Sequence, residues 1–106
     1  MQVKELADGG GALIVDAREP SSFAAGHISG ARSLPLGEAG RPAAARFRED
    51  VPKGKTIIVY CNGFSCHDSL ELGKLLMKWG YPAVYVYEGG YPEWRDAGYP
   101  VERGTR

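Results

Sequence analysis

Three short apolar runs rich in β-forming residues constrain the fold of this chain more than any other feature. They are Leu13–Val15, Thr56–Tyr60 and Ala83–Tyr87. Unbroken apolar runs of this length are typical of strands in a parallel sheet that is covered on both faces. The runs are followed by Asp16, Cys61 and Glu88. Because parallel strands end at one edge of a sheet, these residues are predicted to lie where α/β proteins bind ligands.

One strongly patterned helix is predicted between the second and third runs. Its apolar positions have the spacing i, i+3, i+4 and i+7 of a single helix face, and they are Leu72, Leu75, Leu76 and Trp79. We expect Asp68 or Ser69 to cap the start of this helix and Gly80 to end it.

Weaker helical segments, each with a proline near its first turn, are predicted at Pro20–Ala25, Pro42–Glu49 and Pro92–Ala97, with a further turn at Val3–Ala7. The segment 26–40 reads as surface loop with a short extended piece at Arg32–Leu34. Strands that alternate with helices over such short connections indicate an α/β fold.

The length and charge of the chain limit the class of protein to which it can belong. The 106 residues, 43% of them hydrophobic, fit one globular domain over residues 1–106. Lys and Arg total 13, as do Asp and Glu, so no net charge favours nucleic acid or anionic lipid. No apolar stretch reaches the roughly 18 residues of a membrane span, and the first residues lack the apolar core of a signal peptide. We therefore expect a cytoplasmic protein that neither inserts into membranes nor binds nucleic acid.

The two cysteines are close together in the sequence. Four residues separate Cys61 from Cys66, so a bridge between them would close a very small loop and act as a poor structural staple. Two thiols also fall short of the four ligands of a structural zinc site, even with His27 and His67 nearby as candidates, and no metal is expected.

Cys61 has the position of a nucleophile. It follows the most convincing strand, and the next six residues lead into the most convincing helix. Backbone N–H groups and the helix dipole at such a turn stabilise a thiolate, the reactive form of cysteine, and Gly63 allows a tight turn around the sulfur. The residues alone leave a second interpretation open, in which Cys61 is a small apolar residue at a strand end.

Three separated segments resemble, in order, the motifs of the rhodanese-like domain family. They are LIVDAREPSSFAAGHISGARSLPL (13–36), IIVYCNG (57–63) and YEGGYPEWRDAGYPVE (87–102). The resemblance covers nearly the whole chain. It implies a single rhodanese-like α/β domain with a central, mainly parallel sheet of about five strands and helices on both faces.

The resemblance also implies sulfurtransferase activity without a cofactor. Cys61 would take a sulfane sulfur from thiosulfate or a thiol persulfide, hold it as a persulfide and pass it to a thiol or cyanide, with a protein sulfur carrier as a further candidate partner. The anion-binding loop would be Asn62, Gly63, Phe64, Ser65, Cys66 and His67. Asp16 and Arg18 would support this loop, more as a structural ion pair than as substrate contacts, and His27 would bond to backbone.

The loop departs from the family pattern in its charge and length. Active rhodanese loops commonly carry Arg or Lys directly after the cysteine, whereas residues 62–67 contain neither, and only a protonated His67 would supply charge. The segment from Cys61 to Gly80 is also slightly longer than in typical members. A wider mouth with little positive charge favours a bulky persulfide donor or a protein thiol over thiosulfate.

Two other functions compete with sulfur transfer. One is a non-catalytic binding or regulatory module that keeps the fold. The other is a thiol-disulfide redox protein, in which Cys66 resolves a persulfide or sulfenate on Cys61 to a disulfide. The favoured interpretation of Cys66 is instead a cysteine at a helix start that packs against the sheet. A phosphatase of related fold needs Arg six positions after its cysteine, where this chain has His67, so phosphatase activity is not expected.

Overall fold

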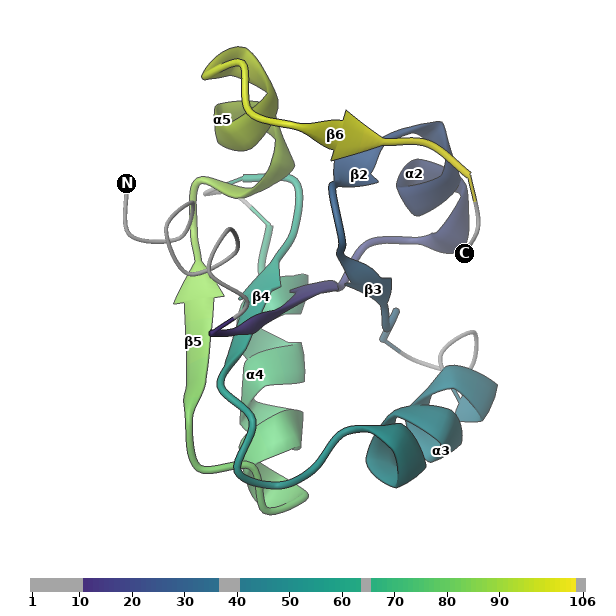
Figure 1. The fold of residues 1–106 in the computed structure, drawn as a ribbon, viewed down its shortest axis with the longest axis vertical. Coiled ribbons are helices and arrows are strands. Elements are labelled where there is room, and N and C mark those ends of the chain that lie inside the picture. Colours follow the sequence, from purple (N-terminus) through teal and green to yellow (C-terminus); the bar gives the residue numbers. More distant parts are fainter. Residues whose placement is uncertain (1–10, 37–40, 64–65, 105–106) are drawn as a thin grey trace.

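The computed structural model describes residues 11–36, 41–63 and 66–104, and the elements alternate as the sequence predicts (Figure 1). In chain order they are β1 (Leu13–Asp16), α2 (Pro20–Ala25), β2 (His27–Ile28), β3 (Arg32–Ser33), α3 (Arg41–Asp50), β4 (Ile57–Tyr60), α4 (Asp68–Lys78), β5 (Val84–Tyr87), α5 (Gly90–Asp96) and β6 (Val101–Glu102). The helical turn predicted at Val3–Ala7 lies outside the described residues. No described helix is long and apolar enough to span a membrane.

The central sheet is parallel throughout its described strands. Its order is β3-β1-β4-β5, and the three apolar runs of the sequence form β1, β4 and β5. The described residues thus hold four strands of this sheet, where about five were expected. A separate antiparallel pair joins β2 to β6, which sequence patterns did not indicate because two-residue strands have no periodicity.

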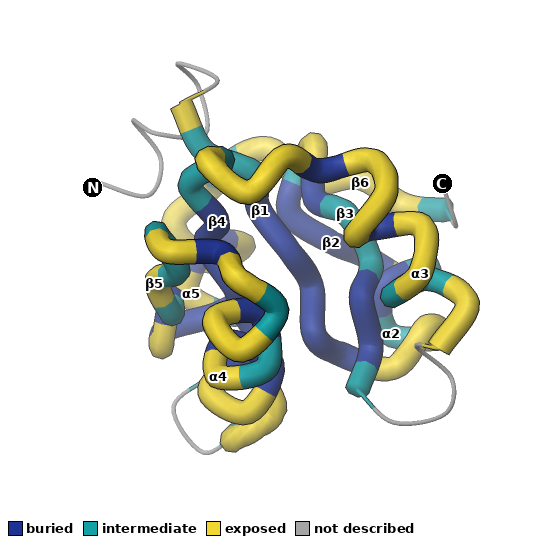
Figure 2. Tube along the Cα trace, turned by 90° about the horizontal axis from the view of Figure 1, so that it is seen from below, coloured by how far each residue is buried: buried dark blue, intermediate teal, exposed yellow. Residues whose placement is uncertain are grey.

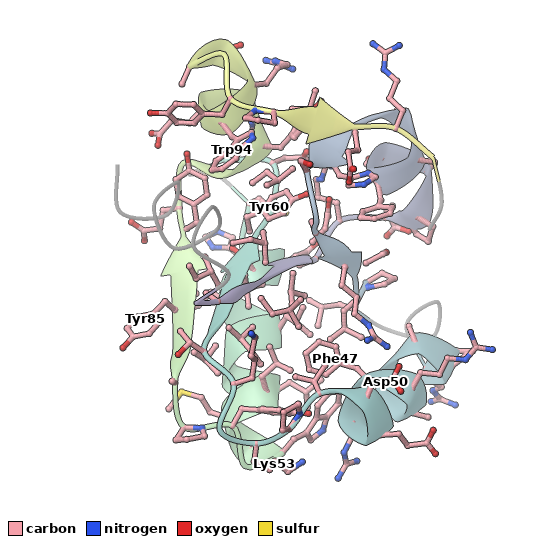
Figure 3. All side chains as sticks on the ribbon, viewed as in Figure 1. Phe47, Asp50, Lys53, Tyr60, Tyr85 and Trp94 are labelled. Atoms are coloured by element: carbon pink, nitrogen blue, oxygen red, sulfur yellow. A yellow bond between two sulfur atoms is a disulfide. The ribbon has the colours of Figure 1, made fainter. Side chains whose placement is uncertain are left out.

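Helices cover both faces of the sheet and create two apolar cores. On one face Phe47 of α3 packs with Leu72 and Leu76 of α4 against alternate residues of β1 and β4. On the other face Phe23 of α2 and Trp94 of α5 pack against the remaining strand residues. Figure 3 shows Phe47 and Trp94 in these two separate layers, and Figure 2 shows the buried inner strands beneath exposed helix surfaces.

The chain changes direction across the sheet between β1 and β4. From β1 it moves outward to β3, then returns through α3 to β4 on the opposite side of β1. Ligands in open α/β sheets bind beyond the carboxyl ends of strands at such a switch point. The backbone N–H of Ala17 donates to the carbonyl of Tyr60 at 3.0 Å, so the two strand ends stay in contact at this edge.

Strand β5 departs from the predicted two-sided burial. Tyr85 is 60% exposed and points away from the sheet in Figure 3, whereas Tyr87 on the same face is 8% exposed. The reason is that α5 begins directly beyond this strand, and Trp94 of this helix packs in the same core as Tyr87. On this face of β5, the described elements therefore cover the carboxyl end and leave Tyr85 exposed.

The predicted start of α4 is wrong, whereas its predicted end is confirmed. The predicted cap at Asp68 or Ser69 is wrong, because the helix already begins at Asp68 and His67 occupies the capping position without a side-chain bond. The backbone of His67 (φ −98°, ψ −4°) is itself helical, which differs from the extended geometry of a side-chain cap. The predicted end is confirmed: Gly80 has φ +105° and the Tyr81 N–H donates to Leu76 O at 3.2 Å.

Candidate active site

Cys61 lies immediately beyond β4, at the switch point of the sheet, and is 2% exposed. Its carbonyl accepts a hydrogen bond from the N–H of Tyr91 at 3.0 Å, which ties the start of α5 to the end of β4. The residue is thus held by its own strand and by a helix that follows the neighbouring strand. The position of Cys61 at the strand end confirms the prediction from the sequence, whereas no sequence pattern indicated the contact with Tyr91.

The turn between β5 and α5 lies directly against the cysteine loop. Gly90 has φ +64°, and a Cβ atom there would collide with the Cys61 carbonyl oxygen and would lie 2.8 Å from the Gly63 nitrogen. Gly63 itself has φ +126°. Both positions require glycine, Gly90 for close approach and Gly63 for its left-handed backbone.

Cys66 returns to Cys61 through a tight turn and forms a disulfide with it. The Cys66 N–H donates to Gly63 O at 3.1 Å, and the two cysteine Cα atoms are 6.2 Å apart. The structure therefore realises the pairing that the redox alternative requires, and Cys66 is partly buried beside the sheet edge. The predicted loop residues Phe64 and Ser65 lie outside the described residues.

Asp68 is a site residue that sequence reasoning missed. Its carboxylate and the two cysteine sulfurs all lie within 4.8 Å of one another. In the described part of the chain these three are the one group of side chains arranged to hold a metal ion, but the sulfurs are bonded to each other and offer no thiolate. The position of Asp68 in the first turn of α4, two residues after Cys66, was the available sequence signal.

Asp16 and Arg18 form a fully enclosed ion pair, as expected for partly buried charges, which need partners. Their side chains are 0% and 4% exposed, and Arg18 Nη2 lies 2.8 Å from Asp16 Oδ2. Arg18 Nε adds contacts of 3.1 and 3.2 Å to the two carboxylate oxygens. The Tyr60 hydroxyl donates to Asp16 Oδ2 at 2.6 Å and accepts the Ile28 N–H. The network thus joins β1, the turn after it, β2 and β4, and Figure 3 labels Tyr60 at its position in β4.

Burial and charge set the protonation of this network. Burial opposes the charge of Arg18, but its hydrogen bond to Asp16 and the carboxylate charge outweigh burial and raise the pKa of the guanidinium. Burial, followed by the charge of Asp16, raises the pKa of Tyr60. Arg18 is therefore a permanent cation and Tyr60 a permanent hydrogen-bond donor in neutral solution.

Arg18 also links the ion pair to the active-site loop. Its Nη1 donates to Asn62 Oδ1 at 3.4 Å, and its Nη2 donates to the Gly26 carbonyl at 2.5 Å. The guanidinium carbon lies 4.5 Å from the centre of the Tyr91 ring, within cation–π range. One buried arginine thus contacts the residue after Cys61 and the helix that binds the Cys61 carbonyl.

The remaining predicted residues occupy the periphery. His67 is exposed at the start of α4. His27 is buried, with Nδ1 2.8 Å from Phe23 O, which confirms its predicted scaffold role. Because Arg18 is already paired with Asp16 and residues 62–67 hold no Lys or Arg, the loop has little positive charge to offer a dianion.

Comparison with known proteins identifies the family. The sequence profile of the rhodanese-like domain matches residues 1–97. Thiosulfate sulfurtransferase GlpE of Pseudomonas putida is 36% identical over 101 residues, covering 95% of this chain and 84% of that protein. GlpE of Pseudomonas aeruginosa is 32% identical over 104 residues, covering 98% and 86%. The chain therefore belongs to the rhodanese-like domain family.

Solved structures agree with this assignment. A rhodanese-like domain from Anabaena has a TM-score of 0.79 at 27% identity and covers 96% of this chain and 74% of that one. SseA from Escherichia coli, a 3-mercaptopyruvate sulfotransferase, has a TM-score of 0.80 at 26% identity over 99% of this chain and 50% of that one. The chain is accordingly an enzyme of the rhodanese-type sulfurtransferase class.

Proposed function

We propose that the protein moves a sulfane sulfur from thiosulfate or a thiol persulfide to a thiol or cyanide through a persulfide on Cys61. In the first step the Cys61 thiolate attacks the outer sulfur of the donor, the donor S–S bond breaks, and sulfite or a thiolate leaves with the electron pair. In the second step the acceptor attacks the outer persulfide sulfur, and the Cys61 thiolate leaves.

The observation that carries this proposal is the placement of Cys61. It stands at the switch point of a parallel sheet, on a loop that leads into the N-terminus of an eleven-residue helix. The unpaired N–H groups at that terminus and the helix dipole favour a thiolate over a thiol. Both steps use the Cys61 sulfur and the stabilisation of its thiolate at the helix terminus.

The disulfide sets a condition on this cycle. In the structure Cys61 is bonded to Cys66 and has no thiolate to offer a donor. Reduction of the pair is therefore the step that makes the enzyme competent. Once it is reduced, the Asp16–Arg18 pair and the Tyr91 N–H still hold the two sides of the loop, because neither contact involves a sulfur atom.

The charges of the site favour a thiol persulfide over thiosulfate as the donor. Thiosulfate carries two negative charges, whereas the described loop residues offer no cation and the Asp68 carboxylate lies within 4.8 Å of both sulfurs. Like charges at that distance repel even in water. The curated relatives are named thiosulfate sulfurtransferases, so we retain thiosulfate as a slower donor.

Intact-protein mass spectrometry tests the proposal most directly. The Cys66→Ser variant, reduced and freed of reductant, is incubated with thiosulfate and separately with glutathione persulfide. We expect a mass gain of one sulfur atom that cyanide removes, with faster loading from glutathione persulfide. Use of this variant prevents the Cys61–Cys66 disulfide from hiding the product.

The double variant Cys61→Ser, Cys66→Ser is the matched control and should gain no sulfur from either donor. Circular dichroism of both variants establishes that they are folded. If the folded single variant also gains no sulfur from either donor, the persulfide mechanism is wrong and the non-catalytic binding module becomes the better interpretation.

A further inference from the structure

We propose that Cys66 is a resolving thiol, which discharges the Cys61 persulfide as hydrosulfide and closes the Cys61–Cys66 disulfide. The inference rests on the proposed persulfide at Cys61 and adds a second outcome to it. Sulfur would leave this enzyme as free hydrosulfide without any external acceptor, and the enzyme would end each such cycle in the oxidised form.

Geometry supports this role. The disulfide forms with an unbroken β4 on one side and an intact α4 on the other, so both partners reach each other without loss of either element. The turn that brings Cys66 back is held by its own N–H bond to Gly63 O, at 3.1 Å, and by the left-handed backbone of Gly63. Their Cα separation of 6.2 Å lies within the ordinary range for disulfides.

The two cysteines of the pair differ in exposure. Cys61 is 2% exposed, whereas Cys66 is partly buried and lies two residues ahead of the first residue of α4. An incoming reductant therefore meets the Cys66 sulfur first. Attack there expels Cys61 as the thiolate, which the helix terminus stabilises, and so restores the nucleophile.

The chemical step balances without any further oxidant. The Cys66 thiol gives its proton to the outer sulfur of the persulfide anion, and its own sulfur attacks the Cys61 sulfur. The bond between the Cys61 sulfur and the outer sulfur breaks, and hydrosulfide leaves with the electron pair and that proton. The outer sulfur is reduced and the two cysteines are oxidised to the disulfide. With thiosulfate as donor, each cycle converts thiosulfate and two thiols into sulfite, sulfide and one disulfide, which an external dithiol then reduces.

The charge of Asp68 also makes a long-lived persulfide on Cys61 less favourable than its release as hydrosulfide. The Asp68 carboxylate lies within 4.8 Å of both cysteine sulfurs, so a persulfide anion held there is repelled by a neighbouring negative charge. Release of hydrosulfide removes that charge from the site. The same carboxylate is therefore unfavourable for a long-lived persulfide anion.

A single-turnover experiment separates the two fates of the sulfur. Reduced wild type, Cys66→Ser and Cys66→Ala, freed of all thiols, are each mixed with excess thiosulfate under argon, and sulfide, sulfite and intact mass are followed. For wild type we expect about one sulfide per protein and a loss of two hydrogens. For both variants we expect no sulfide above the protein-free control and a gain of one sulfur. Addition of dithiothreitol should then restore wild type for a second turnover.

The outcomes distinguish this inference from the proposed function. Wild type that keeps the added sulfur and releases no sulfide, while the variants also load sulfur, overturns the role of Cys66 and leaves the Cys61 persulfide intact. Equal sulfide release from wild type and both variants likewise overturns it. Failure of the folded variants to load sulfur at all overturns the proposed function instead.

Discussion

Two ion pairs of the same chemistry behave differently in this molecule because they differ in burial. Asp16 and Arg18 are 0% and 4% exposed and lie 2.8 Å apart. Asp50 and Arg32 lie 2.9 Å apart but are 58% and 32% exposed. An exposed pair contributes about 0 to 1 kcal/mol, whereas breaking a buried pair by removing one partner costs about 3 to 5 kcal/mol. Loss of the Asp16 side chain should therefore lower the stability of the fold much more than loss of the Asp50 side chain.

At the same scale, Asp68 should limit the use of thiosulfate. Replacement by asparagine, Asp68→Asn, removes a negative charge within 4.8 Å of the Cys61 sulfur. The carboxylate repels the thiosulfate dianion. Removal of this unit charge should therefore raise kcat/KM for thiosulfate by about threefold to tenfold. Steady-state kinetics with cyanide as acceptor measures the change, in the Cys66→Ser background so that no disulfide interrupts the cycle.

The control for this prediction is Glu71→Gln, which also removes a carboxylate from the first turn of α4 but one that pairs with Lys74 at 3.5 Å. It should leave kcat/KM unchanged. The gain in Asp68→Asn should shrink as salt is raised, because added ions screen the repulsion. A decrease in kcat/KM for Asp68→Asn would instead assign the carboxylate a positive role in catalysis.

At the scale of elements, two adjacent glycines give a matched test of the turn between β5 and α5. Gly90→Ala places a Cβ against the Cys61 carbonyl and the Gly63 nitrogen and imposes the left-handed backbone on alanine. We expect a loss of about 2 kcal/mol or more in the free energy of unfolding. In Gly89→Ala the new Cβ meets only the flexible end of the Glu93 side chain, and Gly89 already has helical φ. Urea denaturation of both variants measures the difference, and equal losses would contradict the close packing of Gly90.

Most elements follow from patterns that are local in the sequence. The apolar runs predicted β1, β4 and β5 within about one residue of their ends. Four apolar residues with the spacing i, i+3, i+4 and i+7 predicted α4. The pairing of β2 with β6 was missed because it joins residues at distant positions that have no pattern of their own. The predicted cap at the start of α4 was wrong because His67, whose backbone is already helical, holds the capping position without a side-chain bond.

The residues of the candidate site also divide into those that a local sequence pattern predicts and those that depend on contacts between distant segments. Cys61 and the Asp16–Arg18 pair could be placed from the rule that functional residues follow parallel strands. Gly90 and Tyr91 could not, because their contacts with the Cys61 segment depend on how the ends of β4 and β5 lie together. The spacing of the cysteines favoured a packed Cys66 over a bridge, whereas the structure has the Cys61–Cys66 disulfide, with the Cys66 N–H donating to Gly63 O.

Over the whole molecule, each of the two cores contains a buried tyrosine whose hydroxyl donates within the fold. Tyr81 donates to Val51 O at 2.8 Å in the core beneath α3 and α4, and Tyr60 donates to Asp16 in the other core. Burial raises the pKa of Tyr81, and burial together with Asp16 raises that of Tyr60. These phenols therefore stay protonated in the fold at a pH at which they ionise in the unfolded chain.

Alkaline solution should accordingly destabilise the protein. A phenol with raised folded-state pKa contributes its full stability below its unfolded pKa of about 10, and this stability falls as the pH rises above that value. We expect the free energy of unfolding to decrease between about pH 10 and 11.5, with a shallower slope in Tyr81→Phe. Tyr85→Phe, at a site that is 60% exposed, is the control and should keep the wild-type slope. Urea titrations across this range test the prediction, which fails if Tyr81→Phe and wild type share one slope.

The pairing of β2 with β6 has a consequence for the order of folding. β6 reaches back across the chain to β2, and the Gly104 N–H bonds to Ala24 O in α2. Contacts between such distant positions close a long loop, whose entropy favours their formation after the local ones. Gly26, which receives a hydrogen bond from Arg18, lies between the two segments that β6 and Gly104 secure. The support beneath the cysteine loop is thus completed late, and a chain still in the process of folding would have its sheet before it has a rigid sulfur site.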